Sequence, residues 1–135
     1  MKKNKLFWLY VIFISTIITN NTTMAQKSKP TNDVSYNTMQ IDNIELFYRE
    51  AGLSDKPTIL LLHGFPSSSF MFRNLINQLK DEYHILAPDF PGFGYSSMPS
   101  TDEYLYTFEN YSVLLEKFLE GKNVKKCHFY IFDYG

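Results

Sequence analysis

The residue best placed to do chemistry is Asp133, which follows an apolar run of strand length and precedes Tyr134 and Gly135. A carboxylate and then a Gly at the end of a buried strand are typical of a sharp strand-to-helix turn that exposes its central side chain. A carboxylate held in this way can attack an electrophilic carbon and form a covalent ester. The alternative is that Asp133 only ends a strand or caps a following helix.

A second motif, His63-Gly64-Phe65-Pro66, ends another apolar run seventy residues upstream. Gly64 permits a close approach of the backbone, and Pro66 stiffens the loop and allows a cis peptide bond. Such a loop can aim backbone N–H groups at a developing oxyanion. The alternative is an ordinary turn between a strand and a helix. In α/β sheets the active site lies outside the carboxyl ends of the strands, where both motifs are predicted to lie.

The chain has three histidines, and the sequence favours none of them as a general base. His128 precedes Asp133 by five residues on the same predicted strand, which places it about 16 Å away. A general base must come within about 3.2 Å of the proton that it removes, or act through one water. His84 begins a strand and is expected at the opposite end of the sheet. His63 belongs to the loop itself, where a conformational role is expected.

No motif indicates a cofactor or a metal. Asp89 ends a strand before Gly92-Phe93-Gly94, which favours a role in capping the turn. No G-x-G-x-x-G follows, so no dinucleotide site is predicted. One Cys and three scattered His give no spacing typical of metal ligands.

Apolar periodicity predicts strands that alternate with amphipathic helices. The strands are expected at 44–48, 58–62, 83–87 and 126–132. One helix should carry the stripe Phe72, Leu75, Ile76 and Leu79, capped by Ser67, Ser68 or Ser69, and a second the stripe Phe108, Tyr111, Leu115 and Phe118, with Gly121 as its C′ residue. This order predicts an α/β fold with a mostly parallel sheet, flanking helices and right-handed crossovers.

The first 25 residues are predicted to be a signal peptide. Lys2, Lys3 and Lys5 precede an apolar stretch over 6–18, and small residues lie before a cleavage site after Ala25. A helix of this stretch would be about 20 Å long, short of the ~30 Å hydrocarbon core, which disfavours an uncleaved anchor. The sequence therefore predicts export to the periplasm or the medium, with no stable membrane span after cleavage.

The mature chain would have room for one small core. Residues 26–39 are polar and are predicted to be flexible, and residues 40–135 are predicted to form a partial domain. The net charge is −1 with mixed signs, so nothing indicates a nucleic-acid partner. Cys127 is the single cysteine, which excludes an intramolecular disulfide.

Together these motifs resemble the epoxide hydrolase and haloalkane dehalogenase branch of the α/β-hydrolase fold. The resemblance covers about residues 40–135 and rests on 62–66, Phe72-Arg73, 87–96 and 133–135. It implies that Asp133 is the nucleophile, that the N–H groups of Phe65 and Tyr134 form the oxyanion hole, and that a small-molecule substrate is hydrolysed through an ester without a cofactor. His63, Gly64, Pro66 and Gly135 would support these groups.

Two departures from the family pattern bear on substrate and completeness. Haloalkane dehalogenases commonly carry Asn and Trp as halide donors where this chain has Phe65 and Tyr134. The His-Gly-Phe-Pro form is more similar to epoxide hydrolases, and also to fluoroacetate-type dehalogenases, although Tyr134 departs from the Trp usual in those groups too. The resemblance therefore implies an epoxide hydrolase, with a haloalkane or haloacid dehalogenase as the alternative. Family members are about twice as long or more, so the chain is expected to be truncated at the nucleophile elbow, before the acid and the catalytic His. As given, it is expected to be an inactive fragment, or a non-catalytic half-domain that binds a partner through its open edge.

Overall fold

The computed structural model describes residues 33–135, so the predicted signal peptide and residues 26–32 lie outside it. Strands and helices alternate over most of this range, as the periodicity predicted. The elements are β1 (Ser35–Ile41), β2 (Ile44–Ala51), β3 (Thr58–Leu62), the 3₁₀ turn η1 (Ser69–Phe72), α2 (Arg73–Leu79), β4 (His84–Pro88), α3 (Phe108–Gly121) and β5 (Cys127–Ile131).

The strands form one mixed sheet in the order β1-β2-β4-β3-β5. β3 is parallel to β4 and to β5, whereas β2 is antiparallel to both β1 and β4. The parallel part of the sheet consists of β4, β3 and β5, and β1 and β2 add an antiparallel hairpin beside β4. The short turn between β1 and β2 accounts for their antiparallel pairing, because parallel neighbours need a long crossover connection.

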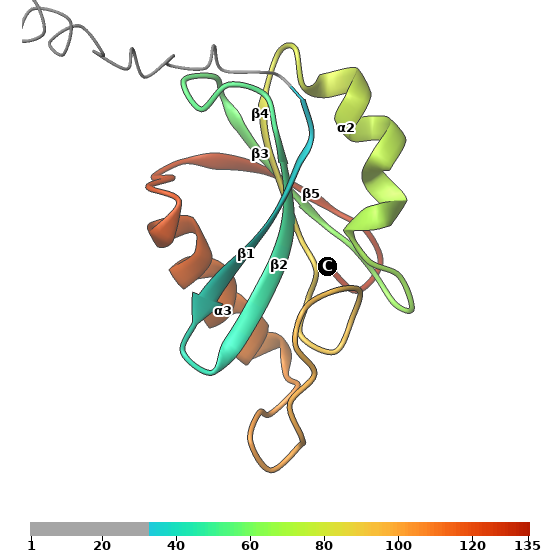
Figure 1. The fold of residues 1–135 in the computed structure, drawn as a ribbon, viewed down its shortest axis with the longest axis vertical. Helices are drawn as coiled ribbons and strands as arrows, with labels where there is room; N and C mark the ends of the chain where they lie inside the picture. Colours follow the sequence, from blue (N-terminus) through green and yellow to red (C-terminus); the bar gives the residue numbers. More distant parts are fainter. Residues whose placement is uncertain (1–32) are drawn as a thin grey trace, which may run out of the picture.

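Helices cover both faces of the sheet, with α3 on one side and α2 on the other (Figure 1). Successive residues of a strand point to opposite faces, and β3 divides its side chains accordingly. Leu60 and Leu62 pack in the core under α3 with Phe118, whereas Leu61 packs under α2 with Ile76. This two-sided burial accounts for the unbroken apolar run over 58–62.

β1 is a correction to the prediction of a flexible segment over 26–39. Residues Ser35 to Met39 lie in this strand, which pairs in register with β2. The side chains of β1 are mostly exposed, and the strand ends at the buried Ile41. A solvated edge strand of polar residues carries little hydrophobic signal, so its pairing to β2 was not visible in the sequence.

Side-chain caps begin η1 and α3, and the cap of η1 is one of the three serines that the sequence predicted. Ser68 caps η1, since its hydroxyl accepts a hydrogen bond from the N–H of Phe70 at 3.3 Å. Thr107 caps α3 by accepting from the N–H of Asn110 at 3.2 Å. Each cap satisfies one of the N–H groups that a helix start leaves unpaired.

The end of α3 differs from the prediction. Gly121 is the last helical residue rather than C′, and Asn123 takes the left-handed conformation with φ 56°. The N–H of Asn123 donates to Glu120 O and that of Val124 to Leu119 O, both at 2.9 Å. This pair of bonds is a Schellman motif, in which Asn replaces the more usual Gly.

The outer edge of β5 has no neighbouring strand within residues 33–135, as expected from the sequence. The large side chains at its carboxyl end are therefore exposed, with values of 56% for Phe129, 47% for Tyr130 and 60% for Ile131. No helix in the described range is long and apolar enough to cross a membrane.

Candidate active site

Three loops meet where the parallel strands end. Leu62 at the end of β3 pairs with Ile131 of β5, and β4 is parallel to β3 on its other side. The loops that begin at His63, Asp89 and Phe132 consequently leave the sheet at the same end, the carboxyl end of the parallel strands. Figure 1 shows the C-terminus beside the loops that follow β3 and β4. The two motifs separated by seventy residues are thus brought together.

Asp133 lies at the tip of a tight turn after β5. Its φ is 54°, in the left-handed region, which a non-glycine residue occupies at some cost. The turn is held by a hydrogen bond from Gly135 N–H to Phe132 O at 3.1 Å, and Phe132 N–H donates to Leu62 O at 3.2 Å. A side chain at position 135 would clash, because its Cβ would lie 2.6 Å from Leu62 O. Gly135 therefore lets the turn pass closely over β3.

The carboxylate of Asp133 faces the loop after β3. The N–H of Phe65 donates to its Oδ1 at 3.2 Å, and the Phe65–Pro66 peptide bond is cis. A Cβ at Gly64 would lie 2.6 Å from the Cβ of Asp133, so only glycine permits this approach. Within residues 33–135, Oδ2 is left without a protein donor and is accessible on an exposed side chain.

His63 is fully buried and ties the loop after β3 to the loop after β4. Its Nδ1 lies 3.1 Å from Gly64 O, and its Nε2 accepts a hydrogen bond from Phe90 N–H at 3.0 Å. This pairing requires the neutral ring with its proton on Nδ1. Burial lowers the pKa of His63, although the Gly64 carbonyl and the charge of Asp89 oppose the shift. The conformational role expected for His63 agrees with these contacts, but its bond to a backbone amide had no signal in the sequence.

The buried carboxylate of Asp89 holds two loop segments through hydrogen bonds to backbone N–H groups. Its Oδ1 accepts the N–H of Ser69 at 2.6 Å, and its Oδ2 accepts the N–H of Tyr95 at 2.9 Å. The prediction that it caps a turn is confirmed, and the carboxylate also holds the first residue of η1. It therefore positions the segment that follows the Phe65–Pro66 loop.

The ring of Tyr134 packs into a group of aromatic side chains beside the turn. Its centroid lies 4.9 Å from Phe108, 6.2 Å from Phe93 and 6.3 Å from Tyr111. Burial, followed by the proximity of Tyr134, raises the pKa of Tyr111 to about 12, so this phenol stays neutral and donates to Pro91 O at 3.2 Å. The wall beside Asp133 is thus uncharged.

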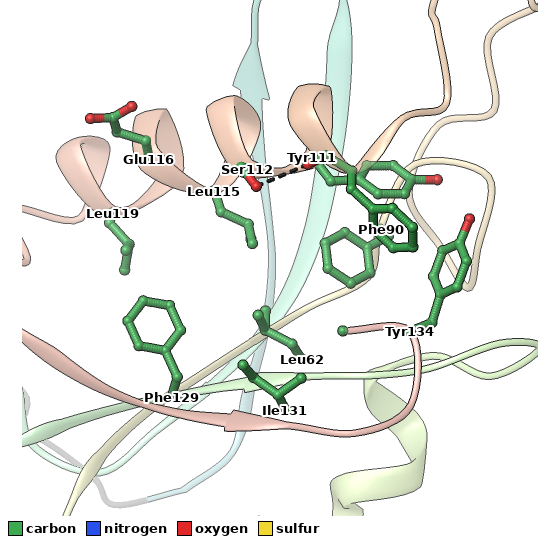
Figure 2. Close-up of a pocket in the computed structure, with 12 residues that line it drawn as sticks. Leu62, Phe90, Tyr111, Ser112, Leu115, Glu116, Leu119, Phe129, Ile131 and Tyr134 are labelled. Carbon is green, nitrogen blue, oxygen red and sulfur yellow. Dashed lines mark hydrogen bonds between the residues drawn. The ribbon is translucent and has the colours of Figure 1, made fainter.

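A cavity of about 400 Å³ opens between α3 and β5, next to Tyr134 and Gly135 (Figure 2). Its walls are mainly apolar and include Leu62, Leu115, Phe129 and Ile131. Asp133 does not line it, since its carboxylate faces the loop after β3. The cavity is therefore the open flank of the sheet under α3, and it is distinct from the space above the carboxylate.

The other two histidines lie away from Asp133, as predicted. His84 pairs with Thr58 at the start of the parallel strands, where its Nε2 lies 2.8 Å from Glu50 Oε1. A hydrogen bond from His84 and then one from Lys122 lower the pKa of Glu50 against the effect of burial. His128 pairs with Ile59, well before the end of β3. Residues 33–135 contain no group of three or more His, Cys, Asp or Glu arranged to hold a metal ion.

A mixed sheet in this order, with helices on both faces and a carboxylate on a sharp turn after β5, defines a domain of the α/β-hydrolase type. The chain belongs to the alpha/beta hydrolase fold family, whose model matches residues 57–135. The fold class inferred from the sequence is confirmed.

Individual relatives agree with this assignment. The chain is 48% identical over 94 residues to the uncharacterized hydrolase YNR064C of Saccharomyces cerevisiae, covering 70% of this chain and 32% of the relative. It is 36% identical over 88 residues to a haloalkane dehalogenase of Bradyrhizobium diazoefficiens, covering 65% and 27%. A loop variant of the haloalkane dehalogenase DbeA from Bradyrhizobium elkanii has a similar structure, with a TM-score of 0.70, 30% identity and coverage of 76% and 33%. The chain spans about a third of the length of these relatives.

Proposed function

We propose that the intact protein is a hydrolase that attacks an epoxide with the carboxylate of Asp133. The observation that carries the proposal is the hydrogen bond from Phe65 N–H to Oδ1, on a carboxylate exposed by a sharp turn. Oδ2 attacks a ring carbon, the C–O bond of the epoxide breaks, and the ring oxygen takes a proton from an acid. The resulting ester is hydrolysed to a diol, which regenerates the carboxylate.

The position of Oδ1 supports the second step in particular. When water attacks Cγ of the ester, negative charge develops on the carbonyl oxygen that came from Asp133. A backbone N–H that already donates to Oδ1 is placed to stabilise that charge. The N–H of Tyr134 is proposed as the second donor, on its resemblance to the family pattern. His84 and His128 lie elsewhere on the sheet, so a residue beyond position 135 would activate the water.

Dehalogenation of a haloalkane is the second candidate, supported by the similarity to haloalkane dehalogenases. It uses the same attack by Oδ2, with halide as the leaving group. Phe65 and Tyr134 weigh against it, because the side chains at these positions do not supply the Asn and Trp donors to halide.

The test is a single turnover of the full-length protein in ¹⁸O-labelled water, with epoxides and haloalkanes as substrates. Attack by Asp133 puts the label into its carboxylate and leaves the first product unlabelled. Asp133→Asn should abolish early turnover, whereas Asp102→Asn, on an exposed loop, should leave it unchanged. Label in the first product, or full activity of Asp133→Asn before any deamidation seen by mass spectrometry, contradicts the proposal.

We also propose that the protein is exported and that residues 1–25 are removed. The support is the basic start, the short apolar stretch and the small residues before the cleavage site. N-terminal sequencing of protein from its native host should give a chain that begins at Gln26. A membrane-bound protein that keeps Met1 contradicts this proposal.

A further inference from the structure

Arg49 on β2 is a buried cation that has no carboxylate partner among residues 33–135. Its side chain lies on the α2 face of the sheet, and the residue is 6% exposed. Its Nε donates to Ser69 Oγ at 3.0 Å, and none of the ion pairs formed within residues 33–135 includes it. A buried charge is normally paired, so this guanidinium requires an explanation.

Aromatic rings surround the guanidinium and fix its orientation. Its Cζ lies 4.9 Å from the ring centroid of Tyr36, 5.6 Å from Phe70 and 5.7 Å from Phe47. Ring faces attract a cation but do not neutralise it. Stacking and the bond to Ser69 therefore hold the planar group in place with its charge still available.

Most donors of the guanidinium are unused. An arginine side chain has five N–H donors, and the bond to Ser69 engages one of them. Nη1 and Nη2 donate to no acceptor within residues 33–135. The one side-chain polar atom in that range that is both fully buried and without a partner is Tyr104 Oη, so Nη1 and Nη2 are not fully buried. The Nη groups therefore reach solvent.

The opening to solvent is a cavity of about 440 Å³ that Arg49 lines. Its other walls are Tyr36, Thr38, Phe47, Phe70 and Tyr95. Tyr36, Phe70 and Tyr95 are 55–73% exposed and surround the opening with aromatic surface. The cavity thus combines a rigid fork of N–H donors with rings that could stack on an apolar body.

We propose that this cavity binds a carboxylate carried on an apolar, preferably aromatic, body. A planar carboxylate matches the two parallel N–H groups of a guanidinium and neutralises the buried charge. The site is separate from Asp133, since β4 and β3 lie between β2 and β5, three strand spacings or about 14 Å. It adjoins the candidate active site through Ser69 and Tyr95, whose N–H groups are both held by Asp89.

The test measures binding of phenylacetate to the full-length protein by titration calorimetry, with neutral phenylacetamide as the matched ligand. Arg49→Met and Arg49→Lys should weaken phenylacetate binding by at least about tenfold, because neither supplies the charged fork. Arg73→Met is the control, since this exposed arginine stacks on the same Phe70 ring at 4.5 Å, and it should change binding by less than about twofold.

Two further variants keep the test decisive. Tyr95→Ala removes an exposed wall of the cavity and should weaken binding even if Arg49→Met fails to fold. Asp133→Ala should leave binding unchanged, which separates this cavity from the candidate active site. Equal binding of phenylacetate and phenylacetamide, unchanged binding to Arg49→Lys, or no binding up to about 10 mM overturns the proposal. Binding of inorganic phosphate in place of phenylacetate overturns the assignment to carboxylates.

Discussion

At the scale of single residues, the candidate site depends on two buried side chains that do not react. Asp89 and His63 are both fully buried. Asp89 accepts the N–H groups of Ser69 and Tyr95, and His63 accepts the N–H of Phe90. Loops need such bonds when they are buried, because they lack the hydrogen bonds of regular structure. The placement of Phe65 N–H against Asp133 therefore depends on two side chains whose hydrogen bonds within residues 33–135 go to backbone groups.

We expect Asp89→Ala to destabilise the protein by about 2–4 kcal/mol, since it leaves the N–H groups of Ser69 and Tyr95 without their acceptor. Asp89→Asn keeps one acceptor oxygen and should cost about half as much. Urea unfolding measures both changes. Asp102→Ala is the matched control on an exposed loop. If Asp89→Ala lowers the free energy of unfolding no more than this control, Asp89 does not hold the loops as described.

His63 should make stability depend on pH. Its folded-state pKa is lowered by burial, so below the ordinary value of 6.5 the unfolded chain binds a proton more readily than the folded one. The free energy of unfolding should then fall as the pH drops through this range, and the contribution is complete above 6.5. His63→Gln removes this titration. Unfolding curves between about pH 8 and pH 5 should show the advantage of wild type over His63→Gln shrinking, and a constant difference refutes the linkage.

At the scale of elements, the sequence was informative where burial imposes a pattern. The strand at 58–62 was predicted with its observed bounds, because both faces of β3 are buried. β1 was missed, since its exposed polar residues leave no apolar pattern. From the sequence, Asp133 could be placed beside Phe65 only by assuming the order of the strands. Arg49 gave no signal, because the residues around it are mostly distant in sequence.

The helix end at Asn123 illustrates how a local rule can choose the wrong residue. Gly121 was expected at C′, yet Asn123 holds the left-handed position. Asn123→Ala should destabilise the protein by about 1 kcal/mol, whereas Asn123→Gly should be neutral or slightly stabilising. Urea unfolding beside the exposed control Lys125→Ala checks this, and equal stability of the Ala and Gly variants contradicts it.

At the scale of the whole molecule, the sheet is covered on two faces but open along β5. Exposed apolar side chains on an unpaired strand promote association between chains. A polypeptide of residues 26–135 should therefore be poorly soluble. It should also be catalytically silent, because its histidines do not lie where they could activate a water beside Asp133. Phe129→Lys should raise its soluble fraction, because the charge lies on the open flank beside Ile131.

Met98→Lys is the matched control for that experiment. Met98 is 76% exposed on a loop, so the variant adds the same charge away from the sheet edge. Ultracentrifugation of both variants separates an edge effect from a general effect of charge. Equal gains in solubility contradict the role of β5, and multiple turnovers by this polypeptide that Asp133→Ala abolishes contradict its expected inactivity.

The hydrogen bond from Phe90 N–H to His63 Nε2 also has a kinetic consequence. This amide can exchange its proton with solvent only when the loop after β4 separates from His63. Its deuterium exchange rate therefore reports how often the contact between the loops after β3 and β4 opens, without any substrate present. The exchange rate of this single amide proton thus measures how often the candidate active site opens locally.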